Sequence, residues 1–253
     1  MKNVLTIAGF DPTGGAGIQA DLKVFYSLGV YGLSAVSALT AQNTKGVEDV
    51  LSISPIFLKK QLSVLLSDIR PDAVKIGMIY SENNAAVIEW AINKYSLKNI
   101  VLDPLIISSS GKRLTEEKAV SRIKNKLFPL CRVITPNISE ASALTGIDIK
   151  NEKDMEKAAV MLKKFGPENI IITGGHLDKT AADIFYNGEF QYLIGKKIKG
   201  EFHGTGCAFS SAVTAFLAKD ENALESSRLA KNFMNKALRK SFYLGKGMML
   251  PDI

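Results

Sequence analysis

Short apolar runs alternate with longer amphipathic segments along most of this chain. The runs are rich in β-branched residues, which is typical of strands that are buried on both faces of a parallel sheet. The intervening segments carry apolar residues at helical spacing, as Met155, Ala158, Ala159 and Leu162 do. The alternation predicts an α/β fold of three layers, with a mostly parallel central sheet and helices on both faces.

The expected elements follow from this pattern and from turn residues. Strands are expected over residues 4–8, 33–39, 47–53, 73–76, 100–102, 133–134 and 170–172, and a β-hairpin over residues 182–193. Helices are expected over residues 16–28, 55–68, 84–94, 115–127, 154–164, 207–218 and 223–240. No repeat, low-complexity tract or linker interrupts them, so we expect one domain spanning residues 1–253.

Composition excludes several classes of protein. The net charge is +7, but the densest lysine cluster, Lys196, Lys197 and Lys199, lacks the interleaved aromatic residues of a nucleic-acid site, so we expect no nucleic-acid partner. The two cysteines, Cys131 and Cys207, are too far apart for a zinc or redox motif. The first apolar run is too short for a signal peptide, and no run approaches a membrane span. We therefore expect a cytoplasmic protein without a membrane partner.

Residues 203–207 place two glycines and a thiol where a helix is predicted to begin. Such a turn leaves backbone N–H groups unpaired, and the helix dipole adds to their attraction for an anion. We expect Gly204, Thr205 and Gly206 to form an anion-binding turn. The same field should favour the thiolate of Cys207, which could then take a proton from a substrate hydroxyl. The alternative is a plain turn followed by a cysteine that packs as a small hydrophobe.

Other chemically useful residues follow predicted strands. Asp103 follows residues 100–102, and Asn137 and Glu140 follow residues 133–134. Carboxylates suit Mg²⁺, although Asp also starts turns and Asn137 with Glu140 also fits a helix capping box. Because ligands of open parallel sheets bind at the carboxyl ends of strands, we expect these groups to share one edge with the glycine turns. That combination predicts phosphoryl transfer.

Taken in order, the segments at these strand ends resemble a known family. They are residues 8–21, 40–44, 75–78, 103–104, 135–140, 174–176 and 203–207. Together they are similar to hydroxymethylpyrimidine/phosphomethylpyrimidine kinases of thiamine biosynthesis, in the ribokinase-like superfamily. The resemblance implies that ATP and Mg²⁺ phosphorylate 4-amino-5-hydroxymethyl-2-methylpyrimidine and then its monophosphate. It also allows a homodimer, because members of this superfamily are often dimers.

The resemblance also implies roles for individual residues. Gln42 would recognise the pyrimidine edge and Met78 would pack on the ring, with further substrate contacts from Gly9, Asp11, Ala16 and Asp21. The amides of residues 204–207 would bind the transferred phosphoryl group, with Cys207 as the base. Mg²⁺ and the ATP phosphates would be served by Asp103, Asn137, Glu140, Thr173 and Gly175, with Asp103 and Glu140 as the metal ligands.

Two departures from the family pattern leave alternatives open. Thr173 and Ser109 stand where relatives often carry lysine, and Lys75 and Lys112 are candidate substitutes for the missing cations. A pyridoxal or pyridoxine kinase of the same superfamily is one alternative, and a pyrimidine-binding sensor without turnover is another. A cysteine hydrolase would need a histidine beside Cys207, whereas His203 is expected on the far side of the turn.

Overall fold

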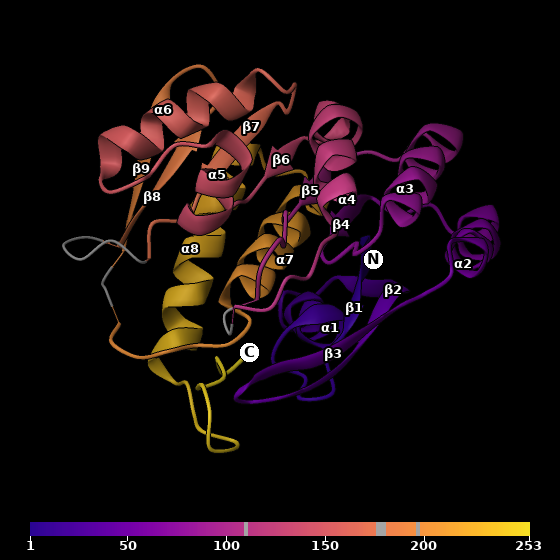
Figure 1. The fold of residues 1–253 in the computed structure, drawn as a ribbon, viewed down its shortest axis with the longest axis horizontal. Coiled ribbons are helices and arrows are strands. Elements are labelled where there is room, and N and C mark those ends of the chain that lie inside the picture. The colour runs from indigo at the N-terminus through magenta and orange to yellow at the C-terminus, as the bar shows by residue number, and fades with distance from the viewer. Residues whose placement is uncertain (109–110, 176–180, 196–197) are drawn as a thin grey trace.

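The computed structural model describes the chain except for residues 109–110, 176–180 and 196–197. The described residues form a nine-stranded sheet between two layers of helices (Figure 1). Its strand order is β3-β2-β1-β4-β5-β6-β7-β8-β9. The strands are β1 (Asn3–Phe10), β2 (Tyr31–Asn43), β3 (Gly46–Ser52), β4 (Ala73–Ile76), β5 (Ile100–Leu102), β6 (Val133–Ile134), β7 (Asn169–Ile172), β8 (Ala181–Tyr186) and β9 (Phe190–Gly195).

The centre of the sheet is parallel. β1 pairs with β2 on one side and β4 on the other, and parallel pairing continues through β5, β6 and β7. β3, β8 and β9 are antiparallel strands at the two edges. The expectation of a mostly parallel sheet is therefore confirmed.

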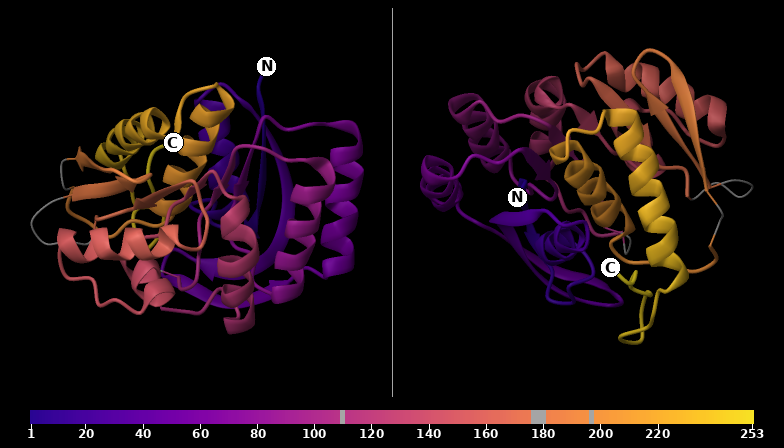
Figure 2. Two further views of the ribbon diagram at one scale, coloured as in Figure 1. Left: turned by 90° about the horizontal axis from the view of Figure 1, so that it is seen from above. Right: turned by 180° about the vertical axis from the view of Figure 1, so that it is seen from behind.

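Residues of the central strands alternate between two cores. In β7, Ile170 and Ile172 belong to one core, while Ile171 faces the other. The first core is covered by α2 (Pro55–Asp68), α3 (Glu82–Tyr95), α4 (Glu117–Arg122), α5 (Ile138–Thr145) and α6 (Glu152–Lys163). The opposite face carries α1 (Gly17–Ser27), α7 (Thr205–Ala218) and α8 (Ala223–Arg239), and Figure 2 shows both layers from other directions. The short strands are apolar because both of their faces are covered.

The helices begin in two different ways. Five of the described helices begin at a Ser or Asn whose side chain accepts a hydrogen bond from an N–H of the first turn: α2, α3, α5, α6 and α8. By contrast, α1 and α7 follow glycine-rich turns, and their own N-cap residues provide no side-chain hydrogen bond. The first N–H of α1, that of Gly17, bonds to the side chain of Cys207, while the first turn of α7 has no side-chain cap at the carboxyl edge of the sheet.

Two elements differ from the sequence prediction. The helix expected over residues 115–127 is α4 followed by a π-helical turn, Ile123–Leu127. The strand expected over residues 33–39 continues to Asn43, because its polar end is held by antiparallel pairing with β3 rather than by burial. Within the ranges that the structure describes, no helix combines the length and the hydropathy needed to cross a bilayer.

Candidate active site

The carboxyl end of the parallel strands gathers most of the predicted site residues. Gly9 lies at the end of β1, Met78 follows β4, Asp103 follows β5, and Thr173 follows β7. The N-terminus of α7 faces the same edge, because a Cβ placed on Gly206 would lie 3.9 Å from Asp103 Oδ2. The sequence argument for a shared edge is therefore confirmed for these residues.

The turn before α7 packs directly on the first glycine loop. Gly204 has a φ of 80° and is the N-cap of α7. A Cβ on Gly204 would lie 1.7 Å from the carbonyl oxygen of Gly15, so only glycine fits at this contact. Two glycine turns thus meet at the start of α7, whose first turn has no side-chain cap. This geometry is suited to binding an anion such as a phosphoryl group.

A buried ion pair lies beneath this turn. Lys75 Nζ is 3.0 Å from Asp21 Oδ1 and 2.9 Å from Asp21 Oδ2, and both side chains are fully buried. Asp21 also accepts hydrogen bonds from Thr6 Oγ1 at 2.6 Å and Ser211 Oγ at 2.7 Å. Burial lowers the pKa of Lys75, but Asp21, Cys207 and Asp103 outweigh it and raise that pKa above its ordinary value. The pair therefore ties β1, β4, α1 and α7 together.

This location corrects one expectation. Asp21 is predicted to contact substrate, but its carboxylate has no exposed surface and is saturated by Lys75, Thr6 and Ser211. Asp21 therefore supports the site from behind. Lys75 and Lys112, the candidate substitutes for missing cations, both have other partners: Lys75 is paired with Asp21 beneath the turn, and Lys112 Nζ donates to the carbonyl oxygen of Glu48 in β3.

The expectation of a thiolate at Cys207 is wrong for this structure. Burial raises the pKa of the Cys207 thiol to about 12, and Asp103 and Asp21 reinforce the shift, although Lys75 opposes it. Burial likewise raises the pKa of Asp103 to about 6, against the lowering effects of Lys75 and of hydrogen bonds from Ser210 and Cys207. The helix N-terminus alone does not ionise a thiol that is buried beside two carboxyl groups.

A second network occupies the open side of the first glycine loop. Asp11 Oδ1 accepts from the Thr13 N–H at 2.8 Å, and Asp11 Oδ2 accepts from the Ala16 N–H at 2.8 Å. His203 Nε2 lies 2.8 Å from Asp11 Oδ2 and 3.0 Å from the terminal amide of Gln42. The ring nitrogen of His203 thus contacts Asp11 and Gln42, and its position beside Gln42 was not expected from the sequence. Residues from β2 and from two separate loops meet here.

Met78 and Gly9 are also in contact. A Cβ on Gly9 would lie 3.0 Å from the sulfur of Met78, which is buried in a small apolar cluster with Ala38 and Leu114. The absence of a side chain at Gly9 therefore leaves room for the thioether. This places Met78, Gly9 and the Asp11 loop on one side of the site.

The segment after β6 forms a capping box. Asn137 Oδ1 accepts from the Glu140 N–H at 2.9 Å, and Glu140 Oε2 accepts from the Asn137 N–H at 2.9 Å. The structural alternative for these residues is therefore confirmed. Asn137 also pairs with Thr173 in a parallel β-bridge, and Gly175 is exposed two residues later. Asn137, Glu140, Thr173 and Gly175 are thus brought together at the ends of β6 and β7.

Two neighbouring buried carboxyl groups, those of Glu140 and Asp103, are candidates for holding a cation. Glu140 Oε1 has no hydrogen bond of normal geometry among the described residues, although the Ile106 N–H approaches this carboxyl group as a donor. Burial raises the pKa of Glu140 well above its ordinary value, and the charge of Asp103 adds to that shift. Within the described residues, no three His, Cys, Asp or Glu side chains form a metal cluster. The pair fits Mg²⁺, which binds through one or two carboxylates and completes its coordination with water and substrate phosphates.

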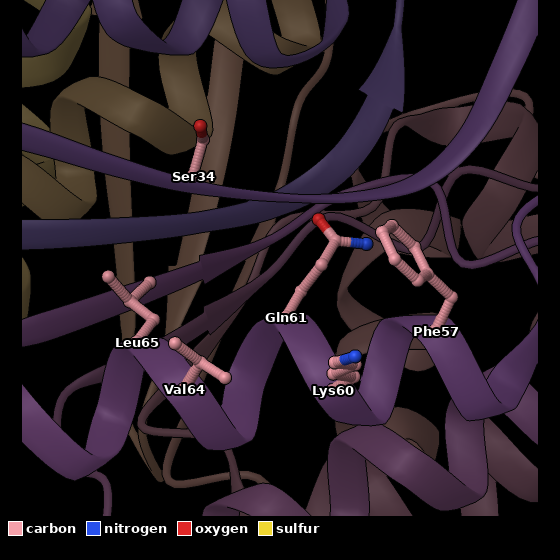
Figure 3. Close-up of a pocket in the computed structure, with 6 residues that line it drawn as sticks. All are labelled: Ser34, Phe57, Lys60, Gln61, Val64 and Leu65. Carbon is pink, nitrogen blue, oxygen red and sulfur yellow. The ribbon is translucent and has the colours of Figure 1, made fainter.

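A separate surface groove lies away from these residues. It has a volume of about 370 Å³ and runs between α2 and β2 (Figure 3). Its lining residues are Ser34, Phe57, Lys60, Gln61, Val64 and Leu65. It contains none of the predicted site residues.

Two networks of the site were not predicted from the sequence, and two of the residues singled out there are not described by the structure. A lysine inside the short buried strand Ala73–Ile76 is a signal that a carboxylate must lie nearby, and it would have led to the Lys75–Asp21 pair. The role of His203 had no such signal, since Asp11 is 192 residues away in the chain. Ser109 and His176 lie outside the described residues.

Comparisons with known proteins agree with this geometry. Residues 11–252 match the family model described as phosphomethylpyrimidine kinase. A hydroxymethylpyrimidine/phosphomethylpyrimidine kinase of Bacillus subtilis is 39% identical over 251 residues, covering 98% of this chain and 93% of that protein. A thiamine biosynthesis bifunctional protein of Geobacter sulfurreducens is 41% identical over 248 residues, covering 97% of this chain and 51% of that protein.

The chain therefore spans about half the length of the bifunctional relative and nearly all of the monofunctional one. A solved structure of the pyridoxal kinase from Staphylococcus aureus in complex with AMP-PCP and pyridoxal superposes with a TM-score of 0.92 at 31% identity, covering 100% of this chain and 93% of that one. The likeness in fold confirms the ribokinase-like expectation. From the family match over residues 11–252 and the identity to named kinases, we conclude that the chain belongs to the phosphomethylpyrimidine kinase family of phosphotransferases.

Proposed function

We propose that the chain transfers the γ-phosphoryl group of ATP to the hydroxymethyl group of 4-amino-5-hydroxymethyl-2-methylpyrimidine. It then phosphorylates the monophosphate to the diphosphate, as a step of thiamine biosynthesis. One observation carries the proposal: the uncapped N-terminus of α7 faces Asp103, while its glycine turn packs on the loop that carries Asp11. Structures of similar kinases hold ADP or an ATP analogue, which supports ATP as the donor.

The backbone amides of residues 204–207 stabilise the phosphoryl group during transfer. The transition state spreads negative charge over three oxygens, and fixed N–H donors at a helix N-terminus lower its energy. Gln42 recognises the edge of the pyrimidine, and Met78 packs on the ring from the Gly9 side. The loop residues Gly9, Asp11 and Ala16 complete the substrate side of the site.

Cys207 acts as the base in this proposal. Its thiol lies in the first turn of α7, next to Asp103 and above Lys75. Because a loose transition state forms little bonding to the attacking oxygen, the hydroxyl proton leaves late. Because its raised pKa keeps the Cys207 thiol protonated before the substrates bind, the thiol must lose this proton before it can accept the proton of the substrate hydroxyl. The thiol proton passes to water, because Asp103, which accepts a hydrogen bond from Cys207, is the proposed ligand of Mg²⁺.

Asp103 and Glu140 hold Mg²⁺ when the nucleotide binds. The divalent ion supplies charge neutralisation between ATP phosphates. Asn137, Thr173 and Gly175 lie at the adjacent strand ends and serve the nucleotide phosphates. The sparsely bonded Oε1 of Glu140 and the nearby charge of Asp103, which raises the pKa of Glu140, support this assignment.

Pyridoxal kinase activity is the second candidate, favoured by the 0.92 TM-score to a pyridoxal kinase that holds pyridoxal. The deciding experiment follows ATP turnover with the aminopyrimidine alcohol, its monophosphate and pyridoxine in parallel, with products identified by mass. We expect both aminopyrimidines to be phosphorylated faster than pyridoxine. Turnover of pyridoxine alone would reverse the assignment, and binding of the pyrimidine without ATP consumption would indicate a sensor.

The same proposal covers the organisation of the chain. The chain acts as one domain over residues 1–253, in the cytoplasm, where ATP is supplied and its two free cysteines stay reduced.

It forms a homodimer through the exposed apolar side chains of α2, which include Ile56, Phe57 and Val64. Light scattering on the wild type and Val64→Lys tests the dimer. A monomeric wild type would exclude it.

A further inference from the structure

His203 connects two residues that are far apart in the sequence. Its Nε2 lies 2.8 Å from Asp11 Oδ2 and 3.0 Å from Gln42 Nε2. The His203 side chain is 13% exposed and that of Asp11 is 4% exposed, so water competes little for these contacts. The Nε2 atom of His203 is therefore within hydrogen-bond distance of both Asp11 and Gln42.

The carboxylate of Asp11 determines where the ring proton lies. Burial raises the pKa of Asp11, but hydrogen bonds from His203 and the Thr13 N–H outweigh it, and the pKa is lowered. Asp11 also accepts from the Ala16 N–H at 2.8 Å, which an ionised carboxylate does best. An ionised carboxylate is only an acceptor, so Nε2 of His203 must carry a proton.

That proton in turn determines the orientation of the Gln42 amide. An N–H at Nε2 requires the amide oxygen of Gln42 on its side, because an NH₂ group there would oppose donor to donor. The structure has Gln42 Nε2 beside His203 and Gln42 Oε1 3.2 Å from Thr40 Oγ1, so these donors and acceptors require the amide to be turned by 180° about its last side-chain bond. Thr40 donates its own proton to the carbonyl oxygen of Phe10 at 2.9 Å, so its oxygen is left to accept from the amide nitrogen. The contacts with His203 and with Thr40 therefore both require the amide oxygen of Gln42 to face His203 and the amide nitrogen to face Thr40.

We propose that His203 is a positioning residue that fixes which way round the amide of Gln42 faces the substrate, and that it thereby selects the orientation of the pyrimidine ring. The inference rests on the proposed function, in which Gln42 reads the ring. Once the amide is turned over, so that Oε1 faces His203 and Nε2 faces Thr40, it offers its acceptor and its donor in one fixed order.

The order of donor and acceptor matters for this substrate. An aminopyrimidine edge presents an amino donor beside a ring-nitrogen acceptor, and an amide pairs with both only in one sense. Turning the amide over would require the ring to turn over too. The hydroxymethyl group, which is next to the amino group, would then change sides. A fixed amide therefore keeps the reacting hydroxyl on a single side of the site.

A matched pair of variants separates this role from packing. His203→Gln keeps an N–H donor near Nε2, whereas His203→Phe keeps the ring shape and removes the donor. For His203→Phe we expect kcat/KM for the aminopyrimidine alcohol to fall about 10- to 100-fold, mainly through KM, with a much smaller change for pyridoxine. His203→Gln should retain most of the wild-type value. Equal losses in both variants, or equal losses for both substrates, would overturn the proposal.

The ring proton can also be observed directly. The chain has two histidines, so the ¹⁵N resonances that disappear in His203→Gln belong to His203. We expect long-range ¹H–¹⁵N spectra to show a proton on Nε2. A ring protonated only at Nδ1 would overturn the inference, whatever the substrate proves to be. Failure of the wild type to phosphorylate the aminopyrimidine alcohol would instead overturn the proposed function, and the spectrum would be unaffected.

Discussion

Lys75 Nζ lies within 3.0 Å of both carboxylate oxygens of Asp21, and neither side chain has exposed surface. Because the pair joins β4 to α1 directly beneath the turn that starts α7, its removal should affect both stability and the site. Breaking a buried pair leaves an uncompensated charge, which is more costly than replacing both partners.

Lys75→Met should therefore lower the free energy of unfolding by about 3 to 5 kcal/mol. Lys75→Met combined with Asp21→Asn should cost less than Lys75→Met alone, because the introduced amide leaves no buried anion, and its oxygen can accept from one of the two hydroxyls of Thr6 and Ser211 while its NH₂ group donates to the other. Urea denaturation measures both. Lys150→Ala is the control, since the Lys150–Asp148 pair is exposed and should contribute nothing measurable. Additive losses in the double variant would contradict this account.

The raised pKa of Asp103 makes that residue a source of pH-dependent instability. Its pKa rises from 3.8 to about 6 on folding, so the fold favours the protonated carboxyl. The unfolded chain therefore holds fewer protons in this range, and the contribution of Asp103 to stability is lost as the pH rises from about 4 to about 6. Asp103→Asn should be more stable than the wild type by roughly 3 kcal/mol at pH 8 and show little difference at pH 3.5.

Urea unfolding without added Mg²⁺ at the two pH values measures this difference. Activity should nevertheless fall in Asp103→Asn, because the proposed cation ligand is lost. A stability difference that is the same at both pH values would show that Asp103 is not the titrating group.

Gly204→Ala should damage the site by a steric route. The added Cβ would meet Gly15 O at 1.7 Å and push the two glycine turns apart, so we expect kcat/KM to fall by about 100-fold or more. Gly146→Ala is the matched control, since Gly146 has a φ of 75° against 80° for Gly204 but has nothing within 4 Å of the added Cβ. Gly146→Ala should lose stability from backbone strain and keep its kinetic constants. Similar kinetic losses in both variants would mean that backbone strain, rather than the contact of the added Cβ with the Gly15 carbonyl oxygen, is responsible.

Cys207→Ala and Cys207→Asp test the thiol as a base. Removal of a general base should lower kcat by about 100- to 10,000-fold, whereas a carboxylate at this position can still take a proton. We expect Cys207→Asp to keep activity that Cys207→Ala lacks, as measured by steady-state ATP turnover. A covalent role for the thiol would abolish activity equally in both.

The sequence predicts the fold well because strands and buried helix faces are local patterns. The strands over residues 73–76, 100–102 and 133–134 and the helix over 55–68 have the predicted bounds, since each is an apolar run or begins at a recognisable proline or cap. The end of β2 was harder to predict. Gln42 and Asn43 are polar and extended, and pairing with β3, not burial, holds them in the strand.

The site is predictable to the extent that it follows strand ends. Asp103, Asn137 and Glu140 could be placed because the end of a parallel strand fixes which edge they share. The ionisation of Cys207 could not, because the pKa of its thiol depends first on burial and then on the charges of Lys75, Asp103 and Asp21, which approach from other elements. The same holds for His203, whose partners come from the first glycine loop and from β2.

The C-terminal segment, which includes residues 247–249, is a part of the site for which the sequence predicted neither an element nor a role. Met248 N–H donates to Thr44 O at 2.8 Å, and His203 N–H donates to Met249 O at 2.9 Å, so this segment joins the tip of the β2–β3 hairpin to the turn before α7 (Figure 1). Gly247 packs closely on the hairpin, where an added Cβ would lie 1.9 Å from the carbonyl oxygen of Thr44.

Gly247→Ala should therefore displace the hairpin tip, which is two residues from Gln42, and weaken pyrimidine binding. We expect KM for the aminopyrimidine alcohol to rise about 10-fold while KM for ATP stays unchanged, because the proposed nucleotide residues follow β5, β6 and β7. Thr44→Val, which removes the hydroxyl that accepts from Gly247 N–H at 3.1 Å, should raise KM for the aminopyrimidine alcohol more weakly.

Gly188→Ala is the control for general destabilisation. Gly188 lies in the β8–β9 turn with nothing within 4 Å of an added Cβ, so this variant should leave KM for the aminopyrimidine alcohol and KM for ATP unchanged. A rise in KM for ATP comparable with that for the pyrimidine would place the effect of the C-terminal segment on the whole site rather than on the hairpin.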